Sequence, residues 1–277
     1  MGAGPVKRLS SFKRTGVAEP FQAQGAGRPV RVLALVLALA VALSTLAPDA
    51  AAKRSPLEEA RSGLDSLATL RDGGGAFDPA IAPLLVEAAV ALGTDPAFWP
   101  DAAHPVLASL RPAGNGTLLA QVRALHARAR AGHGTPADVA ALEASFRDGQ
   151  FGDPVLLNDD MWALRAAHAL GTGAIRLAAY AQAAAHRLAS EQDPGGGWSW
   201  RLGGPASVDV TGMAAVALLE AKALEDGNTT AARAYLAARQ NATSGGYAEE
   251  GGAANCDSTV WAIRGLAALA APVPPAA

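Results

Sequence analysis

The chain repeats itself along most of its length. Four segments share one order of elements: an expected helix, a glycine-rich turn with an aromatic residue, a short loop and a very apolar second helix. The turns lie at 71–77, 147–151, 192–198 and 240–247, and the last three aromatic residues are 47 and 49 residues apart. Such a period is typical of folds built from stacked supersecondary units, so it constrains the fold more than any other feature.

The apolar second helices also repeat in sequence. Trp162-Ala-Leu-Arg165-Ala recurs as Trp261-Ala-Ile-Arg264-Gly, 99 residues further along. A weaker unit without the aromatic turn, at about 101–131, brings the expected number of helical hairpins to five. We expect first helices at 56–70, 102–110, 136–147, 175–190 and 229–240, and second helices at 79–92, 117–131, 155–170, 207–222 and 257–270.

Composition and polarity favour an all-α fold with two kinds of helix. Hydrophobic residues make up 50% of the chain but aromatic residues only 5%, so the apolar mass is mostly Ala, Leu and Val. The second helices are apolar nearly all round, which predicts burial, whereas the first helices carry more charge. An inner ring within an outer ring is an α/α toroid. An incomplete ring or an open α-solenoid fits the same periodicity.

The N-terminal region, residues 1–52, has the pattern of an export signal. Residues 32–43 are an unbroken apolar run with basic residues before it, and Ala50-Ala-Ala52 fits a signal-peptidase site. If the segment is not cleaved, residues 30–47 are expected to anchor the chain and to be its sole membrane contact. Either way, we expect the repeat domain, 53–271, and its Pro-rich tail, 272–277, to be secreted or held at the cell surface.

Three sequons agree with export and predict glycosylation at Asn115, Asn228 and Asn241. The net charge is −2 and no basic stripe is present, so nucleic acid is not an expected partner. The single cysteine, Cys256, excludes an internal disulfide framework and a multi-cysteine zinc site. We expect no metal and no cofactor.

The turn at 192–198, Gln-Asp-Pro-Gly-Gly-Gly-Trp, matches the Q-x3-G-x-W signature of the squalene cyclase and prenyltransferase repeat, and 240–247 varies the same pattern. Over about 55–271 the chain resembles these α/α-toroid proteins, and it is most similar to an exported branch that includes the helical domain of the cobalamin carriers. The resemblance implies a fold but no particular activity, because the same repeat serves cyclases, prenyltransferases and carriers. The expected structural turn residues are Gln192, Gly196, Gly197, Trp198, Gln240, Gly246 and Tyr247.

The catalytic motifs that the resemblance implies are incomplete. Cyclases of this kind protonate an alkene with an acid of a D-x-D-D-T-A motif, and the stretch at 207–212 keeps only Asp209. Asp209 or Ser207 is expected to cap a helix N-terminus, where the dipole would lower the pKa of Asp209. The zinc ligands of protein prenyltransferases, an Asp-x-Cys pair and a later histidine, are missing. Asp209 remains a weak catalytic candidate.

The expected site is the mouth of the ring, where the second helices begin. Asn158 and Asp257 each precede an inner-helix tryptophan by four residues and so are equivalent to Asp209. The candidate ligand-binding residues are Asn158, Asp159, Asp209, Asp257, Trp162 and Trp261, together with the loops 199–206 and 248–255.

The function expected from these residues is non-catalytic binding of a small apolar ligand or of a partner protein. One alternative is a carrier of a corrinoid or an isoprenoid. Another is a degenerate terpene cyclase or prenyltransferase-like enzyme with Asp209 as its acid.

Overall fold

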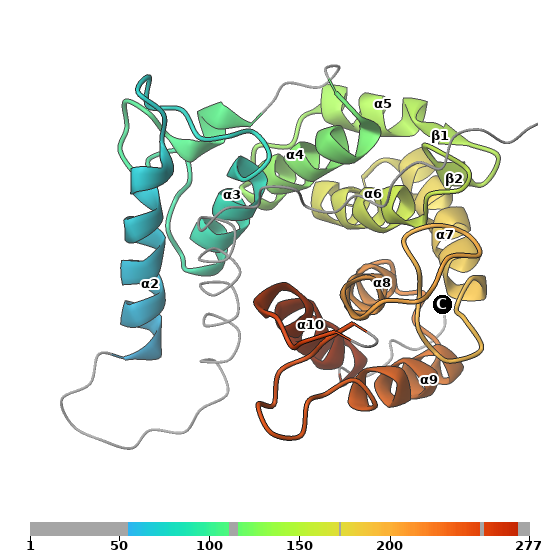
Figure 1. Ribbon diagram of the computed structural model, residues 1–277. Helices are drawn as coiled ribbons and strands as arrows, with labels where there is room; N and C mark the ends of the chain where they lie inside the picture. Colours follow the sequence, from blue (N-terminus) through green and yellow to red (C-terminus); the bar gives the residue numbers. More distant parts are fainter. Residues whose placement is uncertain (1–54, 111–115, 172, 250–251, 271–277) are drawn as a thin grey trace, which may run out of the picture.

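A computed structural model describes residues 55–110, 116–171, 173–249 and 252–270, and over these residues the chain is mostly α-helical (Figure 1). The apolar run at 32–43, the sequon at Asn115 and the tail at 272–277 lie outside the described residues. The elements in chain order are α2 (Pro56–Leu67), η2 (Ala68–Leu70), α3 (Ala82–Ala91), η3 (Val106–Ser109), α4 (Leu118–Arg130), α5 (Pro136–Ala144), β1 (Phe146–Arg147), β2 (Gln150–Phe151), α6 (Leu157–Leu170), α7 (Ile175–Ser190), α8 (Val208–Glu220), α9 (Asp226–Ala237) and α10 (Cys256–Ala270).

The five expected second helices correspond to α3, α4, α6, α8 and α10, and four of the first helices to α2, α5, α7 and α9. The helix expected at 102–110 is wrong: only the short 3₁₀ segment η3 forms there, because Pro105 disfavours helical backbone at the residue before it. α5 ends at Ala144, earlier than expected, because Asp148 and Gly149 take positive φ and close the β1–β2 hairpin. Among the described residues, none of the helices combines the length and apolar character that crossing a bilayer requires.

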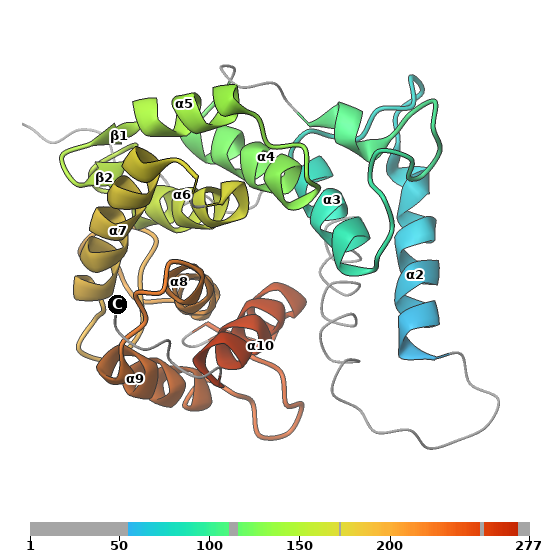
Figure 2. The same cartoon turned by 180° about the vertical axis from the view of Figure 1, so that it is seen from behind.

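The helices form an inner and an outer row. In both views α5, α7 and α9 lie outside α6, α8 and α10, and α2 lies outside α3 (Figures 1 and 2). The inner helices are the apolar ones: residues 161–167 of α6 and 210–218 of α8 are all buried. The larger hydrophobic core runs from α4 to α10, and a smaller one joins α2, α3 and η3, where Phe77 stacks on Trp99.

Three of the aromatic turns are fixed to the inner helices in the same way. The backbone N–H of Phe151, Trp198 and Tyr247 donates to the side chain of the fourth residue of the next inner helix. The acceptors are Asp160 Oδ1 at 2.7 Å, Thr211 Oγ1 at 3.0 Å and Thr259 Oγ1 at 2.9 Å. The sequence repeat therefore corresponds to a repeated local geometry.

Two helices of the inner row approach each other closely at glycines. A Cβ added to Gly212 of α8 would lie 2.1 Å from the carbonyl oxygen of Trp261 in α10. A Cβ on Gly265 would lie 2.6 Å from the Cα of Gly212. Larger residues at either position would push the two backbones apart.

Candidate functional site

A cavity of about 620 Å³ lies where α4 and α6 begin, and we call it the mouth cavity. Its walls are mostly aliphatic, with a few polar side chains and one indole. They consist of Pro79, Ala80, Pro83, Thr117, Leu118, Leu119, Ala120, Arg123, Leu156, Asn158, Asp159 and Trp200. Two expected site residues, Asn158 and Asp159, and Trp200 of the loop 199–206 are therefore brought together. An apolar enclosure with a few polar groups is the usual character of a small-molecule site.

Two polar atoms of the residues that line the mouth cavity lack a partner in the described part of the chain. Arg123 Nε and Asn158 Oδ1 are buried and make no hydrogen bond within the described residues. Burial lowers the pKa of Arg123, an effect that Glu87 and Asp257 oppose. Because buried polar groups are nearly always hydrogen-bonded, such atoms require an explanation, and a ligand or an ordered water would supply one.

Asp159, the acidic residue of the cavity, is engaged by its own loop. Its Oδ2 accepts a hydrogen bond of 3.3 Å from the backbone N–H of Asp153. It also lies so close to Gly152 that a Cβ there would be 2.5 Å from Oδ2. Burial raises the pKa of Asp159, and the neighbouring Asp153 carboxylate adds to the effect.

Asn158, Asp209 and Asp257 take equivalent places, each as the second residue of its inner helix. Only Asn158 lines the mouth cavity. Asp209 and Asp257 are close enough for the Asp209 carboxyl to raise the pKa of Asp257, in addition to the larger effect of desolvation. The structure therefore divides the expected mouth residues into two groups.

Of the two expected cap residues Ser207 is confirmed, and the capping role expected of Asp209 is wrong. Ser207 Oγ caps α8 by accepting from the N–H of Val210 at 3.2 Å, and Glu249 accepts from the N–H of Val208 at 3.0 Å. Asp209 Oδ1 is buried and has no hydrogen-bond partner among the described residues. Burial, with the Glu249 carboxyl adding to it, raises the pKa of Asp209 to about 6, so desolvation outweighs the helix dipole that was expected to lower it.

The expected inner tryptophans lie in a series of stacked cations and rings. Trp162 and Trp261 meet edge to face with their centroids 6.2 Å apart. The guanidinium of Arg123 lies 5.1 Å from the Trp162 ring, that of Arg165 4.7 Å from the same ring, and that of Arg264 4.6 Å from the Trp261 ring. We call these five residues the arginine–tryptophan series. It joins α4, α6 and α10 by cation–π contacts.

A buried glutamate, Glu87 of α3, lies beside this series. Its Oε1 is 3.1 Å from His126 Nδ1, and its Oε2 is 3.4 Å from Arg165 Nη2 and 3.7 Å from Arg264 Nη2. Burial on its own raises the pKa of Glu87, but Arg165, His126 and Arg264 together hold it well below its ordinary value. Glu220 of α8 provides a second carboxylate, with its Oε2 3.4 Å from Arg165 Nε.

This charged centre was missed by sequence reasoning, although a signal for it exists. The Trp-x-x-Arg pattern at 162–165 and 261–264 served only as evidence of the repeat. Three residues separate positions on one face of a helix, so the pattern also predicts that each arginine lies against its own tryptophan. In the described residues no group of three or more His, Cys, Asp and Glu converges to hold a metal ion.

The expected turn residues serve the scaffold. Trp198 is fully buried, and its indole N–H donates to the Leu188 carbonyl at the end of α7 at 2.7 Å. The Gln192 amide donates to the carbonyls of Gly196 and Asn228, which connects this turn to α9. Gly196 has a φ of 91°, and a Cβ on it would lie 2.3 Å from the Ala231 carbonyl oxygen, so a side chain does not fit there.

The second turn is held by fewer bonds. The Gln240 amide donates to the Gly245 carbonyl at 3.0 Å, and Tyr247 is buried beside the half-buried Gly246.

Two of the sequon asparagines are described. Asn241 is exposed. Asn228 Nδ2 donates to the Ala189 carbonyl and to Gln192 Oε1, so a glycan on this atom would compete with both bonds.

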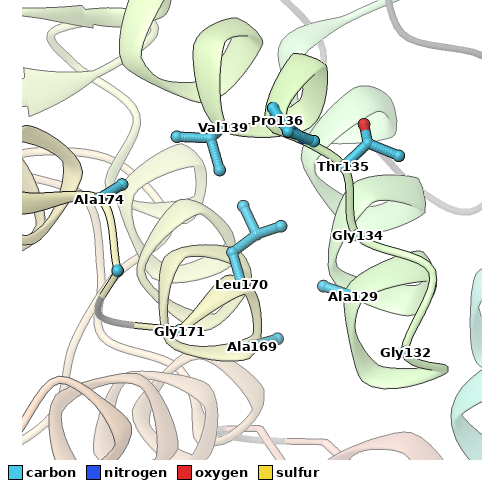
Figure 3. Close-up of a pocket in the computed structure, with 11 residues that line it drawn as sticks. Ala129, Gly132, Gly134, Thr135, Pro136, Val139, Ala169, Leu170, Gly171 and Ala174 are labelled. Carbon is cyan, nitrogen blue, oxygen red and sulfur yellow. The ribbon is translucent and has the colours of Figure 1, made fainter.

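A second cavity, of about 510 Å³, lies where α4 and α6 end (Figure 3). Val139 and Leu170 point into it, and its other walls are glycines, alanines, Thr135 and Pro136. None of the residues that line it is charged. The absence of a charged side chain from its lining distinguishes it from the mouth cavity, which Arg123 and Asp159 line.

In comparisons with known proteins, no family model and no curated protein matches the sequence. The resemblance to the squalene cyclase and prenyltransferase repeat therefore depends on the motif residues themselves.

Proposed function

We propose that the chain is an exported, non-catalytic binding protein of the α/α-toroid type, and that its mouth cavity holds a small, largely apolar ligand. One observation carries the proposal: the lining residues of an aliphatic cavity of about 620 Å³ include two buried polar atoms, Arg123 Nε and Asn158 Oδ1, that have no partner among the described residues. A ligand with an apolar body and a polar end would bury its apolar body against the walls of the cavity. Its polar end would pair with these two atoms.

The contact between α3 and α10 supports the toroid part of the proposal. Glu87 comes from the first inner helix and Arg264 from the last, and their charged atoms are 3.7 Å apart. In an open solenoid the first and last repeats lie far apart, because each repeat contacts only its neighbours. An ion pair between them favours a ring that closes.

The walls of the cavity also favour one kind of cargo. A corrinoid carries amide groups around its rim and needs polar partners on several sides. The aliphatic lining of the mouth cavity suits an isoprenoid-like or other aliphatic body better. Export remains part of the proposal because of the apolar run at 32–43 and the small residues after it.

A cyclase-like enzyme is the second candidate, and one observation favours it. The carboxyl group of Asp209 has a pKa of about 6 and so retains a proton closer to neutral pH than an ordinary aspartate does. However, Asp209 is not among the residues that line the mouth cavity. Turnover of an isoprenoid that Asp209→Asn abolishes, with the fold intact, would favour this candidate over simple binding.

Binding of the neutral apolar dye Nile red tests the proposal. We expect a fluorescence increase that Trp200→Ala weakens at least fivefold, because this change opens one wall of the cavity. The matched control is Ile175→Ala, since Ile175 is 86% exposed on α7 and lines neither of the two cavities. Equal dye binding by wild type and Trp200→Ala would contradict a ligand site at the mouth.

A further inference from the structure

We propose that the ligand of the mouth cavity is a carboxylic acid with an apolar body, and that Arg123 binds its carboxylate. This inference rests on the proposed function and adds the chemical class of the ligand.

Within the part of the chain that the structure describes, Arg123 is the cation of the arginine–tryptophan series that lacks an ion pair. Arg165 is 3.4 Å from carboxylate oxygens of both Glu87 and Glu220, and Arg264 is 3.7 Å from Glu87. Among the described residues, no carboxylate lies within 4 Å of Arg123, and its Nε has no hydrogen-bond partner. Glu87 does not fill this role because its oxygens are shared among His126, Arg165 and Arg264.

The acid of the cavity does not compete for Arg123. Asp159 accepts a hydrogen bond from the Asp153 backbone and packs against Gly152, so its carboxylate is used by the loop. As far as the described residues go, the cavity therefore offers a cation without an ion-pair partner and an anion that already has a hydrogen-bond partner. This arrangement favours a ligand whose polar end is negative.

The surroundings of Arg123 limit the negative charge that the polar end of the ligand can carry. One guanidinium pairs with one carboxylate in a bidentate arrangement, and the guanidinium of Arg123 lies 5.1 Å from the Trp162 ring. Glu87 and Asp257 both interact with Arg123 electrostatically, so a second negative charge at the same place would be repelled. A single carboxylate fits these conditions better than a phosphate or a diphosphate.

Calorimetric titration of the full chain with four probes that share a dodecyl chain tests this inference. The probes are dodecanoate, dodecanol, dodecylamine and dodecyl phosphate, each used below its micelle concentration. We expect dodecanoate to bind at least tenfold more tightly than dodecanol. Tighter binding of dodecylamine or dodecyl phosphate than of dodecanoate would overturn the assignment to a carboxylate, and this comparison needs no variant.

Arg123→Gln then locates the carboxylate. We expect it to remove the preference for dodecanoate and to leave dodecanol binding unchanged, whereas Arg123→Lys retains part of the preference. The matched control is Arg130→Gln, an identical charge change on the same helix at an exposed position outside the cavity. Any binding of the probes to the apolar run 32–43 is the same in all variants, so it does not affect the comparison between them.

A preference for dodecanoate that survives Arg123→Gln would also overturn the inference. If dodecanol binds the wild type but dodecanoate binds no better, the inference fails and the proposed function stands. If none of the four probes binds the wild type, the proposed function fails too.

Discussion

At the scale of single residues, burial and neighbouring charges set the pKa of each carboxyl group. The position of the residue in a helix has a smaller effect on the pKa. Asp209 and Glu87 are both carboxylic acids withdrawn from water. The pKa of Asp209 rises to about 6 because burial is opposed only weakly, whereas cations around Glu87 reverse the effect of burial. Sequence position predicted that Asp209 lies at a helix start, but burial cannot be read from one residue.

The raised pKa of Asp209 predicts a stability that depends on pH. The unfolded chain loses this proton near pH 3.8 and the folded chain near pH 6, so the folded state loses stability as pH rises between these values. Asp209→Asn removes the effect. We compare the free energy of unfolding of the variant with that of wild type at each pH. We expect this difference to shift in favour of the variant by about 1–2 kcal/mol on going from pH 4 to pH 7.5.

Urea unfolding of both proteins at the two pH values measures this gain. A loss of about 1 kcal/mol that is the same at both pH values is what removal of a helix cap would give, and it would contradict the account.

At the scale of elements, the α8–α10 pair depends on two glycines. Because a Cβ on Gly212 would meet the backbone of Trp261 at 2.1 Å, the helices must separate to accept it. We expect Gly212→Ala to lower the free energy of unfolding by about 2 kcal/mol or more, as overpacking does. Gly227→Ala is the control, because Gly227 is exposed in α9 with nothing within 4 Å of the added Cβ.

Chemical denaturation followed by circular dichroism measures both glycine variants. We expect Gly227→Ala to be neutral or slightly stabilising. Equal stability of Gly212→Ala and wild type would show that the two helices are not held at this contact.

Helix positions were largely predictable because they follow from local pattern, whereas contacts between elements were not. The bounds of α4 and α6 come within two residues of the prediction, because apolar runs and caps such as Thr117 mark them. Arg123, Trp162 and Trp261 come from α4, α6 and α10, so their stacking depends on how distant repeats meet. Asn158 and Asp159, two of the expected site residues, line the mouth cavity, whereas Arg123, which also lines it, was not predicted for the same reason.

At the scale of the whole molecule, Glu87 connects α3 to α4, α6 and α10. Glu87→Gln would remove the carboxylate that pairs with Arg264 and would leave Arg165 with Glu220 alone. We expect a loss of about 3–5 kcal/mol in free energy of unfolding, the usual cost of breaking a buried ion pair. Glu59→Gln, at an exposed position in α2, is the control and should change little.

The Glu87 contribution also has a pH dependence of known sign. Its pKa is lowered in the folded chain, so the stabilisation is present above pH 4.5 and is lost as pH falls through the lowered value. If Glu87→Gln lowers the free energy of unfolding no more than Glu59→Gln does, then α3 is held to the other inner helices by apolar packing alone.

The central claim is that the mouth cavity holds a ligand, and native mass spectrometry of the protein purified from its own cells tests it most directly. Wild type is compared with Ala120→Trp, because Ala120 lines the cavity at an exposed position where an indole fills space without disturbing the core. We predict that wild type carries an extra mass of a few hundred daltons that denaturation releases, and that Ala120→Trp lacks it. A bare mass for both proteins, or the same releasable mass on both, would contradict the claim.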